Sequence, residues 1–320
     1  MFNIDTDSIG LPEVQAFLKV WIGGASYLLV VLLGAELLLR TSEWWNAKRE
    51  GRDKKLLPND AIVNMLTSSV YTLTLQGLGF GAIFAAGFWG YNHSHWRIPL
   101  NWWTVVPYIL AGDFLFYFSH RMMHEIRFFW ADHAVHHSSE EFDFSTFQRF
   151  HIFEWAPKVI TFTWLSMMGF HPMVLFLFST LTAVQLICHT ARFGRWGWWD
   201  KFFCSPTIHG VHHARNPLYM DRNLGGATSF WDHVFGTYQN ATEEKLIYGV
   251  THSPKSTNII KVLFWEYTFL WRDFIHAPTL KDKIVVLFGR PGETFEVPWP
   301  QAGKREETAA PEPAQIAAAA

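Results

Sequence analysis

Long stretches without a charged residue constrain this chain more than any other feature. Residues 62–89 and 159–191 contain no Asp, Glu, Lys or Arg over 28 and 33 positions, and residues 98–112 contain none over 15. Residues 21–39 contain a single charge, Glu36. A helix needs about 20 mostly apolar residues to cross a bilayer. The sequence therefore predicts an all-α protein that forms an integral membrane helical bundle.

Two prolines qualify this pattern. Gly169 to Pro172 interrupts the longest stretch, and a proline disfavours helix at the residue before it. The arm before this break is too short to span a bilayer, so we expect a hairpin that enters and leaves by one face. His189 at its end would then lie on the same side as the histidines that precede it. In the shorter stretch, Pro107 predicts a kink.

Positive charges predict the orientation. Residues 40–55 contain six Lys and Arg, whereas residues 90–101 contain only Arg97. The positive-inside rule places residues 40–55 in the cytoplasm, and the next two spans return the chain to that side near Asp113. We therefore expect a membrane protein whose histidines face the cytoplasm. The short chain and its tail rich in Ala and Pro favour a bacterial inner membrane.

Composition excludes other classes of protein. Hydrophobic residues make up 49% of the chain and charged residues 17%, against about 25% charged in an ordinary soluble domain. Aromatic residues make up 17%, which argues against disorder. The formal net charge of −2 offers no basic surface to nucleic acid, so we expect no nucleic-acid partner. Two cysteines exclude a disulfide scaffold, and in the cytoplasm both would be thiols.

Sixteen histidines are the second unusual feature, and twelve of them lie between His120 and His233. Two H-x-x-H-H motifs stand out, because positions i, i+3 and i+4 of a helix share one face and can aim several imidazoles at one point. The nine candidate metal ligands are His120, His124, His133, His136, His137, His189, His209, His212 and His213. Among the other seven, we expect His151, His171 and His233 to be structural.

Nine histidines exceed the four ligands of a zinc site. They suit two metal ions that each take four or five nitrogens. Imidazole binds zinc, copper, iron and nickel alike, so ligand type alone does not select the metal. A membrane setting favours iron, because unactivated C–H bonds are what lipids mainly offer and hydrolysis cannot cut them.

The motifs resemble the signature of the fatty acid hydroxylase and sterol desaturase superfamily, in particular its alkylglycerol monooxygenase-like branch. The resemblance covers about residues 111–237. It includes H-x3-H at His120 and both H-x-x-H-H motifs. Beyond the histidines it extends to the sequences DFLFY (113–117), FWADH (129–133), HSSE (137–140), ST-x-x-R (145–149), SP (205–206), HARN (213–216), DRNLG (221–225) and WD-x-x-FGT (231–237).

The resemblance implies a membrane enzyme with two Fe ions held by histidines, which uses O2 as a cosubstrate and hydroxylates, desaturates or demethylates a lipid. One departure is Gln185, which stands where many fatty acid hydroxylases have a histidine four residues before His189. Glutamine is a poor iron ligand beside imidazole, so we do not count it as one. Either one iron has an open position or Gln185 orients a neighbouring ligand.

Carboxylates usually fix a metal-bound imidazole by accepting its other N–H. The candidates for this supporting role are Asp113, Asp132, Asp221, Asn223 and Asp232. Asp132 could equally be an exposed interfacial acid, and Asp221 and Asn223 could simply form a turn. Arg149 could bind a polar lipid head, although a structural ion pair with Glu154 or Glu141 is favoured.

Electrons must come from a partner. The chain has no G-x-G-x-x-G fingerprint and no cysteine set for an iron–sulfur cluster. We expect an external donor, which could be a ferredoxin, a cytochrome b5-like protein or a reductase.

The sequence thus predicts four regions. Residues 1–110 form the N-terminal membrane helices, and residues 111–240 form a di-iron catalytic domain that includes the hairpin, its histidine-rich helices making a cytoplasmic cap that holds a dimetal centre. Residues 241–299 form an interfacial helical segment, in which residues 258–274 fit a helix on the membrane surface or an ordinary packed helix. Residues 300–320 form a disordered tail.

The predicted function is O2-dependent hydroxylation of a lipid. The order of substrates is an ether or polar bacterial lipid, then a sterol or other isoprenoid, then a fatty acyl chain. The alternative is a desaturase or demethylase of sterols or isoprenoids. A zinc-binding membrane hydrolase or a metal carrier is less favoured, because the histidines exceed what a catalytic zinc uses.

Overall fold

The computed structural model describes residues 59–179, 185–190 and 194–292, together with isolated positions between residues 3 and 51. Most of the span predicted at residues 21–39 and the whole tail at 300–320 lie outside the described residues. The described residues are mostly helical. Among them, no helix combines the length and the hydropathy that a membrane crossing requires.

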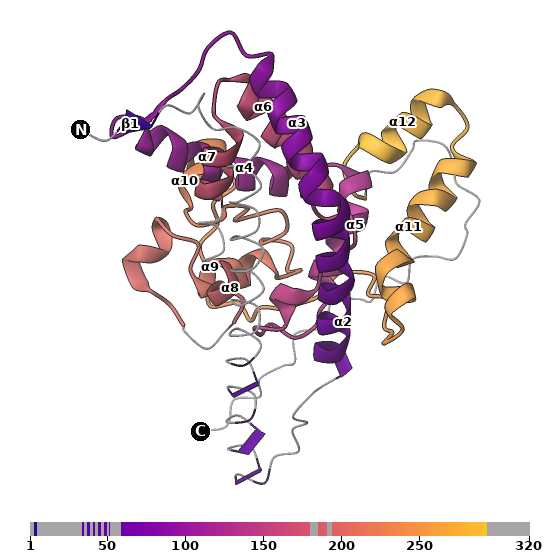
Figure 1. Cartoon of the computed structure of the whole chain (residues 1–320). Coiled ribbons are helices and arrows are strands. Elements are labelled where there is room, and N and C mark those ends of the chain that lie inside the picture. The colour runs from indigo at the N-terminus through magenta and orange to yellow at the C-terminus, as the bar shows by residue number, and fades with distance from the viewer. Residues whose placement is uncertain are drawn as a thin grey trace.

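In Figure 1 a long helical rod runs from top to bottom, between the central helices and the two yellow C-terminal helices. It consists of α2 (Asn59–Thr74), a π-helical turn (Leu75–Gly79) and α3 (Phe80–Asn92). The predicted stretch at 62–89 is therefore helical throughout. A π turn inserts one residue per turn relative to an α-helix, and such turns are often found near functional sites.

The rod packs against α6 (Ala156–Met167) and α7 (Pro172–Ser179), and both of these helices pack against α4 (Val105–Glu125). Phe84, Leu115 and Phe162 are among the buried side chains that they share. Two glycines of α3 allow a close approach to α6. A Cβ at Gly87 would lie 2.6 Å from the Phe162 ring, and one at Gly90 would lie 2.5 Å from the Thr163 carbonyl oxygen.

The break predicted in the longest apolar stretch is present. Helix α6 ends at Met167 and α7 begins at Pro172, and between them Gly169 has a φ of +95°, which favours glycine. The Gly169 carbonyl accepts a hydrogen bond from the Ile98 amide at 2.9 Å. The second arm of the predicted hairpin lies partly outside the described residues.

The predicted kink at Pro107 is wrong. Helix α4 begins at Val105, so Pro107 lies in the first helical turn. There the missing N–H would have had no intrahelical partner, and a proline is tolerated without bending the helix. The segment before α4 is extended instead. Its residues Leu100–Asn101 (β2) pair antiparallel with Asn3–Ile4 (β1), and the two strands form a short sheet.

Short helices follow around the centre of the molecule. They are α5 (Arg127–His137), a 3-10 turn at Thr146–Gln148, α8 (Gln185–Cys188), a 3-10 turn at Gly197–Lys201, α9 (Pro206–His212) and α10 (Phe230–Phe235). Helices α11 (Ile259–His276) and α12 (Leu280–Phe288) form a separate arm beside α5 (Figure 1). Because α11 packs on α5 and α2, it has the contacts of a packed helix.

Candidate metal centre

Four helical elements bring the nine predicted histidines together. His120 and His124 lie in the last two turns of α4, and the first H-x-x-H-H motif ends α5. His189 directly follows α8, and the second motif ends α9. The start of helix α9 is fixed by its cap: the Ser205 side chain accepts a hydrogen bond from the Ile208 amide at 3.2 Å. Pro206 follows at the first helical position, where proline is favoured. All nine side chains are buried.

The nine imidazoles divide into two groups, in each of which the nitrogens lie within 4.8 Å of one another. The five-histidine group consists of His120, His124, His133, His137 and His212. The four-histidine group consists of His136, His189, His209 and His213. These numbers agree with the expectation of four or five nitrogens for each of two ions.

The two H-x-x-H-H motifs are interleaved. His133 and His137 of α5 join the five-histidine group, and His136 joins the other. In α9 the assignment is reversed, since His209 and His213 join the four-histidine group and His212 the five. Neighbouring residues of a helix point about 100° apart, because one turn takes 3.6 residues. Each pair of adjacent histidines therefore serves both groups, which holds them side by side.

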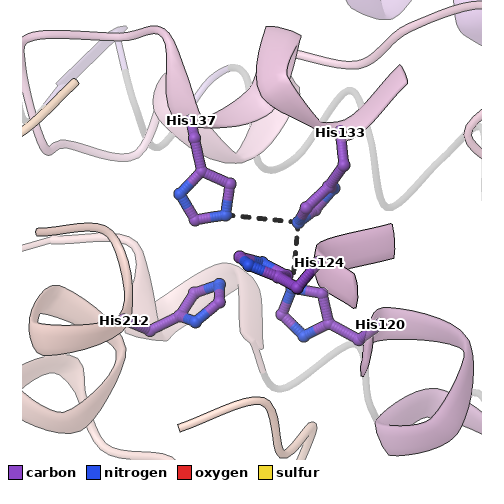
Figure 2. A group of neighbouring side chains, drawn as sticks. All are labelled: His120, His124, His133, His137 and His212. Carbon is purple, nitrogen blue, oxygen red and sulfur yellow. Dashed lines mark hydrogen bonds between the residues drawn. The ribbon is translucent and has the colours of Figure 1, made fainter. Parts of the chain in front are cut away.

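The nitrogens inside each group are close. Figure 2 shows the imidazoles of the five-histidine group turned toward one another, with His133 Nε2 2.9 Å from His120 Nε2 and 3.2 Å from His137 Nε2. In the four-histidine group, His209 Nε2 lies 2.9 Å from His189 Nε2 and 3.1 Å from His213 Nε2. The Nε2 atoms of His124 and His212 are buried without a hydrogen-bond partner among the described residues.

The other ring nitrogen, Nδ1, points outward in seven of the nine histidines. Backbone carbonyls face this nitrogen in four of them: Leu224 for His120 at 2.9 Å, Arg149 for His136 at 3.1 Å, Gln185 for His189 at 2.7 Å and Arg222 for His212 at 2.8 Å. Carboxylates face it in two, namely Asp221 for His124 at 3.0 Å and Glu154 for His133. In His209 it meets the Cys204 sulfur at 3.7 Å. A carbonyl can only accept, so in these four histidines (His120, His136, His189 and His212) Nδ1 carries the proton and Nε2 presents a lone pair inward.

This arrangement fits a metal ion in each group. Burial is the first cause that lowers the pKa of His136, to about 3, and it lowers the pKa values of His133, His212 and His213 as well. These four imidazoles are therefore neutral at pH 7. Neutral rings with facing lone pairs repel at about 3 Å unless a cation lies between them. Nitrogens bound at about 2.1 Å to one ion lie about 3.0 to 3.4 Å apart by geometry, close to the spacing within both groups.

The predicted supporting carboxylates have different partners. Asp221 lies 3.0 Å from His124 Nδ1. Asp113 accepts instead from the Ala227 amide at 3.1 Å and from Thr228, and Asp232 accepts from the Leu224 and Gly225 amides. These two acids fix the loop whose Leu224 carbonyl holds His120, so their effect on the cluster is indirect.

Two further predicted residues lie outside direct contact with the cluster. Asn223 donates to the Ile208 and Gln239 carbonyls and has a φ of +56°, so it shapes the turn before Leu224. Asp132 is buried rather than exposed, which excludes the interfacial alternative. It pairs with His151 and accepts from the Tyr267 hydroxyl at 2.8 Å. His151 thus belongs to neither histidine group and pairs with a buried acid, which agrees with its predicted structural role.

The sequence pattern missed Glu154. This acid is 3% exposed and accepts from His133 Nδ1, and burial followed by the charge of Asp132 raises its pKa to about 8. The ion pair predicted between Arg149 and Glu154 or Glu141 is wrong. The Arg149 guanidinium pairs with Asp60 and donates to Asn64 at 2.9 Å, because α2 packs against this segment. Its backbone carbonyl is what orients His136.

Gln185 makes two hydrogen bonds, one through its side-chain amide and one through its backbone carbonyl. Its side chain donates to the Gly225 carbonyl at 2.9 Å, while its backbone carbonyl accepts from His189. The residue thus orients a clustered histidine, which is one of the two alternatives that the sequence left open. The spacing of four residues between Gln185 and His189 already indicated that the two residues are neighbours.

The comparisons with known proteins address the same region of the chain. Residues 105–237 match the family model named fatty acid hydroxylase, and they include every clustered histidine. Residues 105–237 are thus similar to the fatty acid hydroxylase family. It is similar to human alkylglycerol monooxygenase, with 33% identity over 205 residues, which is 62% of this chain and 43% of the human protein.

Other relatives have comparable sequence identity to this chain. The alkylglycerol monooxygenase of Caenorhabditis elegans is 30% identical over 253 residues, or 77% of this chain and 48% of that protein. The ornithine lipid hydroxylase of Rhizobium tropici is 29% identical over 153 residues, or 46% of each chain. The matched region spans less than half of each of these relatives. No solved structure matches the chain.

Proposed function

We propose that this protein is a di-iron oxygenase that hydroxylates a lipid with O2 and electrons from an external donor. The observation that carries the proposal is the pair of buried histidine groups, each of which could hold one metal ion between its facing nitrogens. The match of residues 105–237 to the fatty acid hydroxylase family model supports lipid hydroxylation. The names of the relatives favour an ether lipid or a polar lipid as substrate, ahead of a sterol, an isoprenoid or a fatty acyl chain.

The protein's own role in this chemistry follows from its contacts. When bound, iron supplies the reduction of O2 and the attack on a C–H bond. The outward hydrogen bonds of the seven Nδ1 atoms fix each ring and its tautomer. The burial of all nine rings keeps bulk water from the centre. Overall, one lipid C–H bond, one O2, two electrons and two protons give one alcohol and one water. We propose that a ferredoxin, a cytochrome b5-like protein or a reductase delivers the electrons.

We also propose a location. The uncharged stretches and the distribution of Lys and Arg favour an integral membrane protein of a bacterial inner membrane, with the histidine groups on the cytoplasmic side. A substrate dissolved in the bilayer and a soluble electron donor could both reach a centre at that surface.

The direct test uses the full chain purified in detergent and loaded with iron. A lipid extract is incubated with 18O2, a reductant and a ferredoxin–reductase pair, and products are analysed by mass spectrometry. We expect two irons per chain and one 18O atom in a lipid hydroxyl group. Loss of two hydrogens without added oxygen would indicate a desaturase. One zinc per chain and no dependence on O2 would overturn the proposal. The variant His213→Ala is the matched control and should lose activity together with metal.

A further inference from the structure

The segment between α5 and α6 carries the carbonyl that holds one clustered histidine. The Arg149 carbonyl lies 3.1 Å from His136 Nδ1 and accepts a hydrogen bond from it. His136 belongs to the four-histidine group. Arg149 directly follows the 3-10 turn and has a φ of −86° and a ψ of 89°, so no helix sets the direction of its carbonyl. The contacts of the Arg149 side chain therefore decide where this carbonyl points.

The buried guanidinium of Arg149 returns to the helix that carries His136. Its Nε atom donates to the Val135 carbonyl at 3.0 Å and to the Ser138 hydroxyl at 2.9 Å, at the C-terminal end of α5. The side chain and the backbone carbonyl of Arg149 thus both hold the same short stretch of chain. Displacing the guanidinium would therefore also displace the carbonyl that faces the His136 ring.

Helix α2 supplies the other contacts of this guanidinium. Arg149 Nη1 donates to the Asn64 side-chain oxygen at 2.9 Å and pairs with Asp60. Asp60 and Asn64 are four residues apart and share one face of α2. The Asp60 carboxylate also accepts from the Ser139 hydroxyl, and the Asn64 amide donates to the Ser145 hydroxyl at 3.0 Å. One face of α2 therefore holds both ends of the segment that follows α5.

Asp60 balances the charge of this buried arginine. Among the described residues, it is the acid that forms an ion pair with Arg149, and the two side chains are 28% and 3% exposed. Removing one partner of a buried ion pair leaves an uncompensated charge, which is strongly unfavourable. Loss of the Asp60 charge would therefore pull the guanidinium toward water and away from its contacts at the end of α5.

The outward partners of the five-histidine group come from other segments. They are the Leu224 and Arg222 carbonyls and the carboxylates of Asp221 and Glu154. Three of these residues lie in the loop between α9 and α10, and Glu154 lies just before α6. A change at Asp60 should therefore act mainly on the four-histidine group.

We propose that Asp60 is a positioning residue for the metal site of the four-histidine group. It acts through Arg149, whose guanidinium it holds and whose carbonyl fixes the ring and the tautomer of His136. The inference rests on the proposed function, because it needs a metal ion in this group. Helix α2, which carries no histidine, thus sets the affinity of one of the two ions.

The test measures metal affinity, which is independent of turnover. The full chain in detergent is loaded with Fe2+ without O2, and release of the two ions to a chelator of known affinity is followed. In Asp60→Asn we expect the ion of the four-histidine group to bind about tenfold more weakly, the lower end of the effect of a residue that supports a ligating histidine. The other ion should keep its affinity. His213→Ala identifies the ion of the four-histidine group, to which His213 belongs.

Asp273→Asn is the matched control. Asp273 pairs with Arg127, the first residue of α5, and the two side chains are 16% and 6% exposed. This variant also removes the charge that balances a buried arginine, so it should lower the thermal midpoint as Asp60→Asn does. Because the Arg127 pair lies at the opposite end of α5 from His136, both metal affinities should stay within about threefold of the original protein.

Arg149→Lys serves as a second variant if Asp60→Asn does not fold. Lysine keeps the positive charge, but its single nitrogen cannot replace the fork of donors that reaches both α2 and the end of α5. The same ion should therefore weaken. Mössbauer spectra of the protein loaded with 57Fe add a signature that a loss of stability alone would not move. The iron signal that His213→Ala changes should also change in Asp60→Asn and Arg149→Lys, and the other signal should not.

Unchanged release of the four-histidine ion in these variants, or equal weakening of the two ions, would overturn the inference. The two proposals also fail in different ways. If lipid takes up 18O but Asp60→Asn keeps both metal affinities, the positioning assignment alone is wrong. If the selective weakening is present but no lipid takes up 18O, the oxygenase assignment is wrong and Asp60 remains a positioning residue of a metal site.

Discussion

Replacing Glu154 with glutamine should weaken one metal site and spare the other. Glu154 is buried and accepts a hydrogen bond from His133 Nδ1, and His133 belongs to the five-histidine group. The amide oxygen of glutamine can still accept that bond. Burial raises the pKa of Glu154 to about 8, but a cation bound by the five-histidine group favours the ionised carboxylate. Glutamine removes that negative charge, and with it some of the electron density that the imidazole offers to a metal.

The magnitude follows from the role of such partners. Removing a carboxylate that supports a ligating histidine typically costs 10- to 100-fold in metal affinity, which is about 1.4 to 2.7 kcal/mol. Four other histidines remain in the five-histidine group, so we expect the site to weaken by about this factor rather than disappear. The histidine that Glu154 orients is not a member of the four-histidine group, which should therefore keep its affinity.

The assay is a competition between the protein and a chelator of known affinity, which resolves the two ions by their release. Asp200→Asn is the control, because Asp200 is also buried but accepts from the Trp196 amide at the start of the 3-10 turn at Gly197–Lys201. It should lower the thermal midpoint and leave both metal affinities within about threefold of the original protein. Unchanged release of both ions from Glu154→Gln, or equal weakening of the two, would refute the reasoning.

Three further predictions address the pairing, the charge state and the packing. His212→Ala should lower the metal affinity of the five-histidine group, and His213→Ala should lower that of the four-histidine group, although the two residues are adjacent. The same pattern of metal release to a chelator in both variants would contradict the assignment. Burial lowers the pKa of His136 to about 3 from 6.5, so in metal-free protein the unfolded chain binds a proton below pH 6.5 that the folded chain does not. The free energy of unfolding should therefore fall as pH drops from 6.5 toward 3, by about 1.4 kcal/mol per pH unit for this residue alone, and urea unfolding that is equal at pH 7 and pH 5 would contradict it. Gly90→Ala should destabilise the fold by about 1 to 3 kcal/mol through its clash with the Thr163 carbonyl, whereas Gly81→Ala has open space and should stabilise it by about 0.5 to 1 kcal/mol; equal denaturation midpoints for the two variants would count against the packing of α3 on α6.

The histidine constellation could be predicted from the sequence because helical spacing is local. Positions i, i+3 and i+4 share a face in any helix, so each H-x-x-H-H motif had to aim its imidazoles at one region. The hairpin break was equally local, since Pro172 cannot continue the helix before it. The division of each motif between two groups is local as well, because neighbours such as His136 and His137 point about 100° apart on a helix.

The residues that orient the histidines could not be predicted in the same way. Glu154 stands 21 positions from His133 in a segment without periodicity, and its contact depends on how α6 follows the 3-10 turn. Most of the other partners are backbone carbonyls, as for Leu224 and Arg222, and a carbonyl has no sequence signal. The kink expected at Pro107 failed because the start of α4 is set by the extended segment before it, which pairs with Asn3–Ile4.

The central claim is that two ions lie in the two histidine groups. Anomalous diffraction recorded at the iron absorption edge, on crystals of the iron-loaded full chain, tests it most directly. We predict two peaks, one among the nitrogens of His120, His124, His133, His137 and His212 and one among those of His136, His189, His209 and His213. A single peak, or peaks outside these groups, would contradict the claim.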